Sequence, residues 1–216
     1  NNIYLAGFTA GGLDGNTNSG SYDTFLVKYN SSGTKQWTQQ LGTSSRDIVT
    51  RVTVDSSDNI FVTGTTYGGL DGNTNSGDND IFLVKYNSSG TKQWTKQLGS
   101  TSSDVGFRVS VDSSDNIYLT GYTAGGLDWN TNSGDNDTFL VKYNSSGTKQ
   151  WTQQLGTSTD DLGYGVAVDS SNNIYLTGWT QGGLDGNINA GGQDIFLVKY
   201  NSSGVKQWTQ QLGTSA

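Results

Sequence analysis

Short apolar runs separated by turn residues recur along the whole chain. In residues 105–111, apolar residues alternate with polar or small ones, and a period of two is typical of a β-strand. Residues 138–143 are apolar at nearly every position, as expected of a strand that is covered on both faces. Residues 149–155 are mostly polar apart from Trp151 and Leu155, which favours an outer edge strand. We therefore expect an all-β protein.

These runs belong to one unit that occurs four times. Successive copies of an Asn-Ile segment start 57 residues apart, and such a fixed period indicates a repeat architecture. We treat the chain as one repeat domain, 1–216, with the units 2–58, 59–115, 116–172 and 173–216, the last one truncated. Within each complete unit we expect four strands, of which 105–111, 117–121, 138–143 and 149–155 are one set.

Four antiparallel strands with a polar outer strand describe one blade of a β-propeller. The fold class that we expect is therefore an all-β propeller of four-stranded antiparallel blades. The chain begins at the second strand of a unit, so its first blade should have only three strands. Three interpretations follow: a four-bladed ring with one incomplete blade, half of a larger ring closed by a second copy, or part of a longer array.

Three motifs carry a resemblance to a known family. They are the Asp-x-x-x-Asn-Ile-Tyr-Leu-x-Gly hairpin from Asp112, the Phe-Leu-Val-Lys-Tyr strand from Phe139, and the Gly-x-x-x-Trp-x-x-x-Leu-Gly segment from Gly147. The unit resembles the bacterial SBBP β-propeller repeat over essentially the whole chain, and its strand order resembles the WD-repeat blade more distantly. The resemblance implies a secreted or cell-surface protein and no catalytic activity.

Composition excludes several function classes. The net charge is −7 and all 19 acidic residues are aspartate, so the chain should repel nucleic acids and favour cations or cationic partners. It has no His and no Cys, so Ser and Cys nucleophiles lack their usual base. Its aspartates recur in every unit, whereas a catalytic pair is normally singular, so we do not expect an enzyme. No run reaches transmembrane length, and we expect no membrane insertion.

The loop between the second and third strands of each unit is a candidate calcium site. Oxygen-bearing side chains stand at its positions 1, 3, 5 and 10, and the first three resemble the front half of a calcium loop. The loop also looks like the calcium loops of integrin-type propellers, although the last Asp comes one residue later. The candidate ligands are Asp14, Asn16, Asn18, Asp23, Asp71, Asn73, Asn75, Asp80, Asp128, Asn130, Asn132, Asp137, Asp185, Asn187, Asn189 and Asp194. Turn capping without a metal is the alternative interpretation, and the WD-repeat resemblance implies such a role for the last Asp.

Aromatic residues vary near these loops. The position after the glycine of the second strand holds Phe8, Thr65, Tyr122 or Trp179, and Trp129 interrupts one loop. Phe8, Tyr122, Trp129 and Trp179 could form sugar-stacking sites, although local packing or surface drift more often explains such variation. The leading function is a non-catalytic extracellular structural or binding module, with adhesion or scaffolding as its role and Ca²⁺ as its only candidate cofactor. The alternatives are a repeat lectin that binds glycans, and a homo-oligomer that forms by strand exchange through the first blade.

Overall fold

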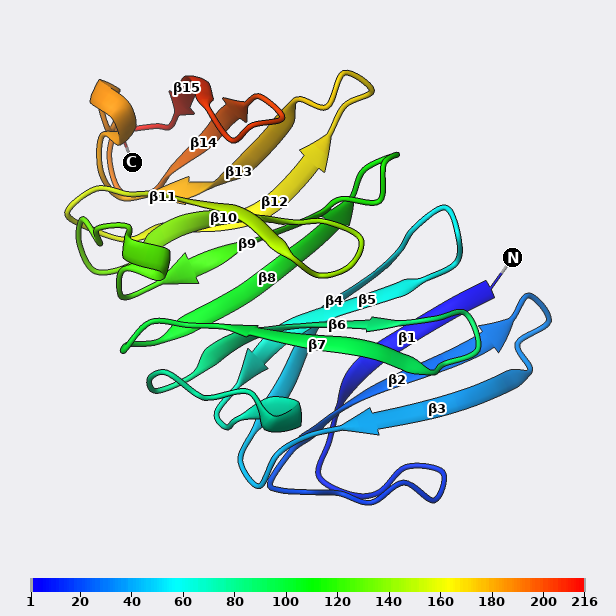
Figure 1. Cartoon of the computed structure of the whole chain (residues 1–216). Coiled ribbons are helices and arrows are strands. Elements are labelled where there is room, and N and C mark those ends of the chain that lie inside the picture. Colours follow the sequence, from blue (N-terminus) through cyan, green and yellow to red (C-terminus); the bar gives the residue numbers. More distant parts are fainter. Residues whose placement is uncertain (1, 216) are drawn as a thin grey trace.

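Fifteen strands form four antiparallel sheets, in the order expected of propeller blades (Figure 1). The computed structural model describes residues 2–215. Blade 1 consists of β1 (Asn2–Thr9), β2 (Asp23–Asn30) and β3 (Lys35–Leu41). Blade 2 consists of β4 (Asp47–Val54), β5 (Ile60–Thr66), β6 (Asp80–Tyr86) and β7 (Lys92–Leu98).

The remaining two blades repeat this pattern. Blade 3 consists of β8 (Asp104–Val111), β9 (Ile117–Thr123), β10 (Asp137–Tyr143) and β11 (Lys149–Leu155). Blade 4 consists of β12 (Asp161–Val168), β13 (Ile174–Thr180), β14 (Asp194–Tyr200) and β15 (Lys206–Leu212). Within residues 2–215, the helical content is confined to three single 3-10 turns: η1 (Leu70–Gly72), η2 (Leu127–Trp129) and η3 (Leu184–Gly186). The all-β propeller prediction is confirmed.

The blades stand side by side in chain order, with blades 1 and 4 at opposite ends (Figure 1). The first strands of blades 2, 3 and 4 are neighbours: β4 contacts β8, and β8 contacts β12. We call these three the inner strands. The buried apolar residues form three clusters, which lie between blades 1 and 2, blades 2 and 3, and blades 3 and 4. Within residues 2–215, no such cluster joins blade 4 to blade 1.

The third strand of a blade shows why neighbouring blades are needed. β6 and β14 have the same sequence, DIFLVKY, but different burial. In β6, between two neighbours, only Lys85 is not fully buried. In β14, at the end of the array, exposed and buried residues alternate over the first five positions. The alternation expected of a half-covered sheet appears only where one neighbour is missing.

A β-bulge interrupts the same position of every inner strand. The pairing with the next strand skips Thr50 in β4, Phe107 in β8 and Tyr164 in β12. The strand predicted at 105–111 is present as β8, with a bulge at Phe107 that the period of two did not predict, because a bulge leaves one residue unpaired and bends the strand. In blade 2 the unpaired bulge residue is Thr50. Its side chain contacts blade 3, where its hydroxyl donates to the Gly106 carbonyl at 2.6 Å.

Two buried or half-buried aspartates in blade 3 differ in their electrostatic environment. Asp104 begins β8, is 0% exposed, and accepts hydrogen bonds from the backbone N–H and the hydroxyl of Ser100 at 2.6 and 2.9 Å. Burial raises the pKa of the Asp104 carboxyl. Asp112 caps the turn after β8. Burial acts to raise the pKa of Asp112, but hydrogen bonds, chiefly from Asn116, outweigh it and lower the pKa.

Replacement of these two aspartates by asparagine should reveal opposite pH dependences. An unfolded chain releases an aspartate proton near pH 3.9. Folded Asp104 keeps its proton to a higher pH, so the wild type should lose stability relative to Asp104→Asn as the pH rises from about 4 through the raised pKa. Folded Asp112 ionises at a lower pH, so the wild type should lose stability relative to Asp112→Asn as the pH falls from about 4. Urea unfolding at a series of pH values measures both, and parallel curves for the wild type and either variant would contradict the corresponding shift.

Candidate functional site

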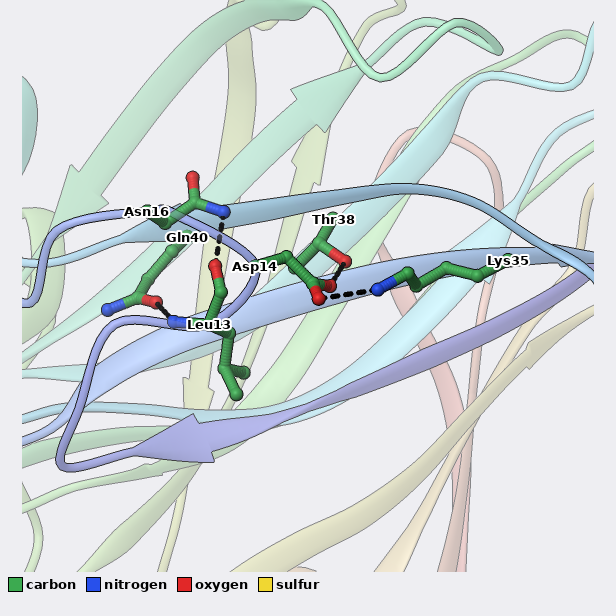
Figure 2. A network of polar contacts seen from close by, with 6 residues as sticks. All are labelled: Leu13, Asp14, Asn16, Lys35, Thr38 and Gln40. Carbon is green, nitrogen blue, oxygen red and sulfur yellow. Dashed lines mark hydrogen bonds and ion pairs between the residues drawn. The ribbon is translucent and has the colours of Figure 1, made fainter.

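The first aspartate of each predicted calcium loop forms an ion pair with the outer strand of its own blade. The Asp14 carboxylate accepts from the Lys35 ammonium and from the Thr38 hydroxyl, both at 2.5 Å (Figure 2). The same pair of contacts recurs in the other three blades, from Lys92 and Thr95 to Asp71, from Lys149 and Thr152 to Asp128, and from Lys206 and Thr209 to Asp185. A lysine thus already supplies the positive charge that faces each carboxylate.

The asparagines of these loops turn their amide nitrogens toward the backbone. Asn16 donates to the Leu13 carbonyl at 2.7 Å, while the Leu13 N–H donates to the Gln40 side chain at 3.0 Å (Figure 2). Asn18 donates to the Gly20 carbonyl. Asn73, Asn130 and Asn187 form the Asn16-type bond, whereas Asn75, Asn132 and Asn189 form bonds related to that of Asn18. These are the contacts of capped turns.

The last aspartate of each loop is buried. Asp23 is 1% exposed, and one of its oxygens accepts from the Ser19 N–H at 2.8 Å and from Gln40 at 3.1 Å. Asp80, Asp137 and Asp194 accept the equivalent pairs of bonds. Asp14 therefore faces the outer strand, Asp23 closes the loop, and the two asparagines bond loop carbonyls. In this arrangement the predicted ligands do not converge as one set, and calcium binding stays a prediction.

The second oxygen of the buried loop aspartate explains a repeated glycine. A Cβ atom on Gly99 would lie 2.0 Å from Oδ1 of Asp80, so Gly99→Ala should destabilise the fold by about 2 kcal/mol through steric strain. Gly11→Ala is the matched control, because a Cβ there would meet nothing within 4 Å, and its effect should stay within about 0.5 kcal/mol. Thermal and urea unfolding measure the two losses, and equal effects would contradict this role of Asp80.

Several positions that change their chemistry from blade to blade contact one another in two groups. They lie in β1, β8, β9 and β12 and in the loops before β2, before β4 and after β5. We call this set the aromatic row: Phe8, Tyr22, Arg46, Tyr67, Phe107, Tyr122 and Tyr164. Four of its aromatic members are exposed: Phe8, Tyr22, Tyr67 and Tyr164.

One part of the row joins blades 1 and 2. The rings of Phe8 and Tyr22 meet edge to face at a centroid distance of 5.4 Å. The Arg46 guanidinium lies 5.6 Å from the Tyr22 ring and 5.5 Å from the Tyr67 ring, which is within range for cation–π attraction. The backbone N–H of Tyr67 donates to the Arg46 carbonyl at 2.9 Å and fixes the two residues together.

The other part of the row joins blades 3 and 4. The bulge residues Phe107 and Tyr164 stack at 4.8 Å with an interplanar angle of 8°. Tyr122 of β9 lies 5.5 Å from Phe107. Burial raises the pKa of Tyr122, and the Tyr67 hydroxyl adds to the shift electrostatically. The bulge is what brings aromatic side chains of successive inner strands into contact.

A groove runs along the inner strands. Its volume is about 510 Å³, and its polar lining includes Arg51, Arg108, Ser110 and Tyr175. Arg108 follows Phe107 directly in β8, but no member of the aromatic row lines the groove. Among the described residues, neither guanidinium forms an ion pair with a carboxylate. The groove therefore offers hydrogen-bond donors that no carboxylate of the described residues engages.

The four predicted sugar-stacking residues do not form one site. Phe8 and Tyr122 belong to the aromatic row, Trp179 is half-buried in β13, and Trp129 stands alone on η2 with full exposure. Sequence reasoning missed Tyr22, Arg46, Tyr67, Phe107 and Tyr164. The available signal was the difference between repeats at these positions.

Trp129 occupies a backbone conformation that suits glycine. Its φ is +70°, and the equivalent residues Gly15, Gly72 and Gly186 have φ between +78° and +82°. Trp129→Gly should therefore stabilise the fold by about 0.5–1 kcal/mol, because the relief of strain exceeds the entropy cost of glycine. Gly72→Trp in blade 2 is the reciprocal control and should destabilise by a similar amount. A lower melting temperature for Trp129→Gly would contradict this prediction, because it would mean that the exposed indole stabilises the fold.

The chain is similar to curated proteins and to a solved structure. The curated relatives include an uncharacterized WD repeat-containing protein of Acanthamoeba polyphaga mimivirus, 27% identical over 82% of this chain and 16% of its own length. Another is the regulatory protein FlaEY of Caulobacter vibrioides, 26% identical over 92% of this chain and 24% of its own length. The chain thus spans less than a quarter of both proteins. A Bacteroides caccae protein of unknown function aligns with a TM-score of 0.34 and 10% identity, over 88% of this chain and 77% of that one.

Within the described residues, no helix is long and apolar enough to span a membrane.

The most specific similarity is to a protein family. Residues 36–71, 93–128 and 150–185 each match the family described as a beta-propeller repeat, SBBP, and together they make up half of the sequence. Each match runs from the outer strand of one blade through the inner strand to the loop of the next. The chain therefore belongs to the SBBP beta-propeller repeat family.

Proposed function

We propose that this chain is a non-catalytic binding module of a secreted or cell-surface protein, and that its ligand binds at the aromatic row. The observation that carries the proposal is the contrast between repeated and varied side chains. Polar residues that recur in every blade, such as Asp14 and Asp23, are engaged in turns and ion pairs. Residues that differ between blades meet one another at the row, where three tyrosines and Phe8 remain exposed.

The chemistry of the row and of the groove favours a glycan. Exposed aromatic rings present flat apolar faces that can stack on the apolar face of a sugar ring. A specific site also needs a few convergent polar groups. Arg51, Arg108 and Ser110 line the groove along the inner strands and can donate hydrogen bonds to sugar hydroxyls or carboxylates. Tyr164 is 45% exposed while stacked on Phe107, so one of its faces is fixed and the rest is accessible.

The roles that the aspartates already have support the proposal of a non-catalytic module. Asp104 and Asp161 are buried at the starts of the inner strands of blades 3 and 4 and accept hydrogen bonds from Ser100 and Thr157. Asp14 and its equivalents are neutralised by lysines. Glycoside hydrolysis needs a carboxyl pair that flanks the substrate, and the described residues along the groove include no such pair.

A glycan array followed by calorimetry with the best hit tests this function. Tyr164→Ala and Phe107→Ala should each lower the affinity about ten-fold, since one stacking contact contributes about 0.5–1.5 kcal/mol. Trp129→Gly is the matched control, because it removes an exposed aromatic residue outside the row, and it should leave the affinity unchanged. Circular dichroism and melting temperature confirm that the variants remain folded.

Two results would contradict the proposal. One is an array without hits for the folded wild-type chain. The other is a bound glycan whose affinity is insensitive to Phe107 and Tyr164. In the second case, sensitivity to Trp129 would instead locate the ligand at the outer loops.

A further inference from the structure

Blade 4 ends the array with an apolar face that no described part of the chain covers. Ile195, Leu197 and Leu212 are 59%, 39% and 70% exposed. Together with the exposed Trp208 they form a surface that we call the blade 4 end face. The equivalent leucines and isoleucine of blade 2 are at most 8% exposed, because blade 3 covers them: Ile81, Leu83 and Leu98. An interior blade thus buries the same side chains that blade 4 leaves in water.

Blade 1 presents the complementary face at the other end. Ile3 and Leu5 of β1 are 53% and 51% exposed, whereas Ile60 and Val62, their equivalents in blade 2, are 0% and 1% exposed against blade 1. We call Ile3, Leu5 and the β2–β3 turn the blade 1 end face. The chain therefore carries both halves of its own blade-to-blade interface, one at each end.

A lysine and a backbone carbonyl define the register of every internal junction. In each case the lysine of the third strand donates to a serine carbonyl in the turn of the next blade, 60 residues later. The three pairs are Lys28 with Ser88 at 2.7 Å, Lys85 with Ser145 at 3.2 Å, and Lys142 with Ser202 at 3.2 Å. The remaining lysine of this set is Lys199 in blade 4, and the remaining serine carbonyl is that of Ser31 in blade 1.

A tryptophan and a glycine mark the same register sterically. At each junction the indole of the outer strand lies so close to a turn glycine of the next blade that a Cβ there would be 2.9 Å or less from the nearest atom. The pairs are Trp37 with Gly90, Trp94 with Gly147, and Trp151 with Gly204. Gly33 of blade 1 has the same positive φ, but a Cβ on it would meet nothing within 4 Å. Trp208 of blade 4 is 38% exposed, so one indole and one glycine remain without this contact.

We propose that the blade 4 end face binds the blade 1 end face of a second copy of this chain, in the arrangement of the three internal junctions. In that arrangement Lys199 donates to the Ser31 carbonyl of the other copy, Trp208 covers Gly33, and Leu197 packs near Ile3 and Leu5. The contact is heterologous, so two copies can close a ring or further copies can extend the series. Apolar side chains that water now contacts supply the driving force.

The contact between copies should be weaker than an internal junction. At the internal junctions the inner strand of the following blade also packs against the preceding blade, as Val49 and Val52 of β4 do against blade 1. Blade 1 has no inner strand within residues 2–215. The association should therefore be reversible and depend on concentration.

Sedimentation analysis over a wide concentration range tests the association. The wild-type mass should double, or rise further, as the concentration rises. Leu197→Asp disables the blade 4 end face and Leu5→Asp disables the blade 1 end face, and each variant alone should remain monomeric. Both side chains are exposed, so the charge should not disturb folding, which circular dichroism checks. The matched control is Ile188→Asp, because Ile188 is 88% exposed on a loop outside both end faces, and it should associate like the wild type.

Mixing the two end-face variants is the decisive step. Each keeps one intact face, so an equimolar mixture should form a one-to-one dimer that cannot grow. Single cysteines at Lys199 in Leu5→Asp and at Ser31 in Leu197→Asp, in a chain without other cysteines, should be linked by a short bismaleimide only in the mixture. A mixture that stays monomeric, or a wild type that stays monomeric at every concentration reached, would overturn the proposal. Association of either variant alone, as from non-specific adhesion of apolar surfaces, would overturn it as well.

Discussion

Every blade has two apolar faces, and the fold depends on both being covered by neighbours. A sheet can expose one face to water when the side chains on that face are polar. A strand such as β6 has almost no polar side chains on either face, so both faces must be covered. The identical sequence of β14 shows the consequence, because the loss of one neighbour brings Ile195 and Leu197 into water. Burial of these side chains is the dominant favourable term in folding. The stability of each blade is therefore largely a property of its interfaces, as in other repeat proteins.

This dependence determines how the polar residues are used. Blades must stack at a fixed register, so the loops and turns between strands have to be rigid. Asp23 closes one loop, Asp112 caps one turn, and Asp14 ties a loop to the outer strand through Lys35. Because the same requirement arises in each blade, these side chains repeat. Residues free of this requirement can vary, and they do so at the aromatic row.

The sequence was sufficient for the repeat, the strand order and most strand limits. The expected strand 149–155 coincides with β11, and 138–143 lies within β10. It was insufficient where local geometry overrides the pattern. The bulge at Phe107 leaves the alternation of apolar residues nearly unchanged, so periodicity could not reveal it. The calcium-like spacing did not reveal where each side chain points, because the direction of a side chain in a loop depends on distant partners. The lysine that follows each loop aspartate by 21 residues was the signal of the ion pair that the aspartate forms.

The acidic composition can be understood in the same terms. An excess of aspartate over lysine and arginine suggests a surface that attracts cationic partners. In this fold, however, many aspartates serve backbone geometry. Asp55, Asp112 and Asp169 cap the turns after the inner strands, and the loop aspartates are buried or paired with lysine. Aspartate is used because its short carboxylate accepts backbone N–H groups two to four residues away, which longer acidic side chains do less well. The net charge is therefore largely a by-product of turn chemistry repeated in each blade, and the identity of a ligand is better sought where the blades differ.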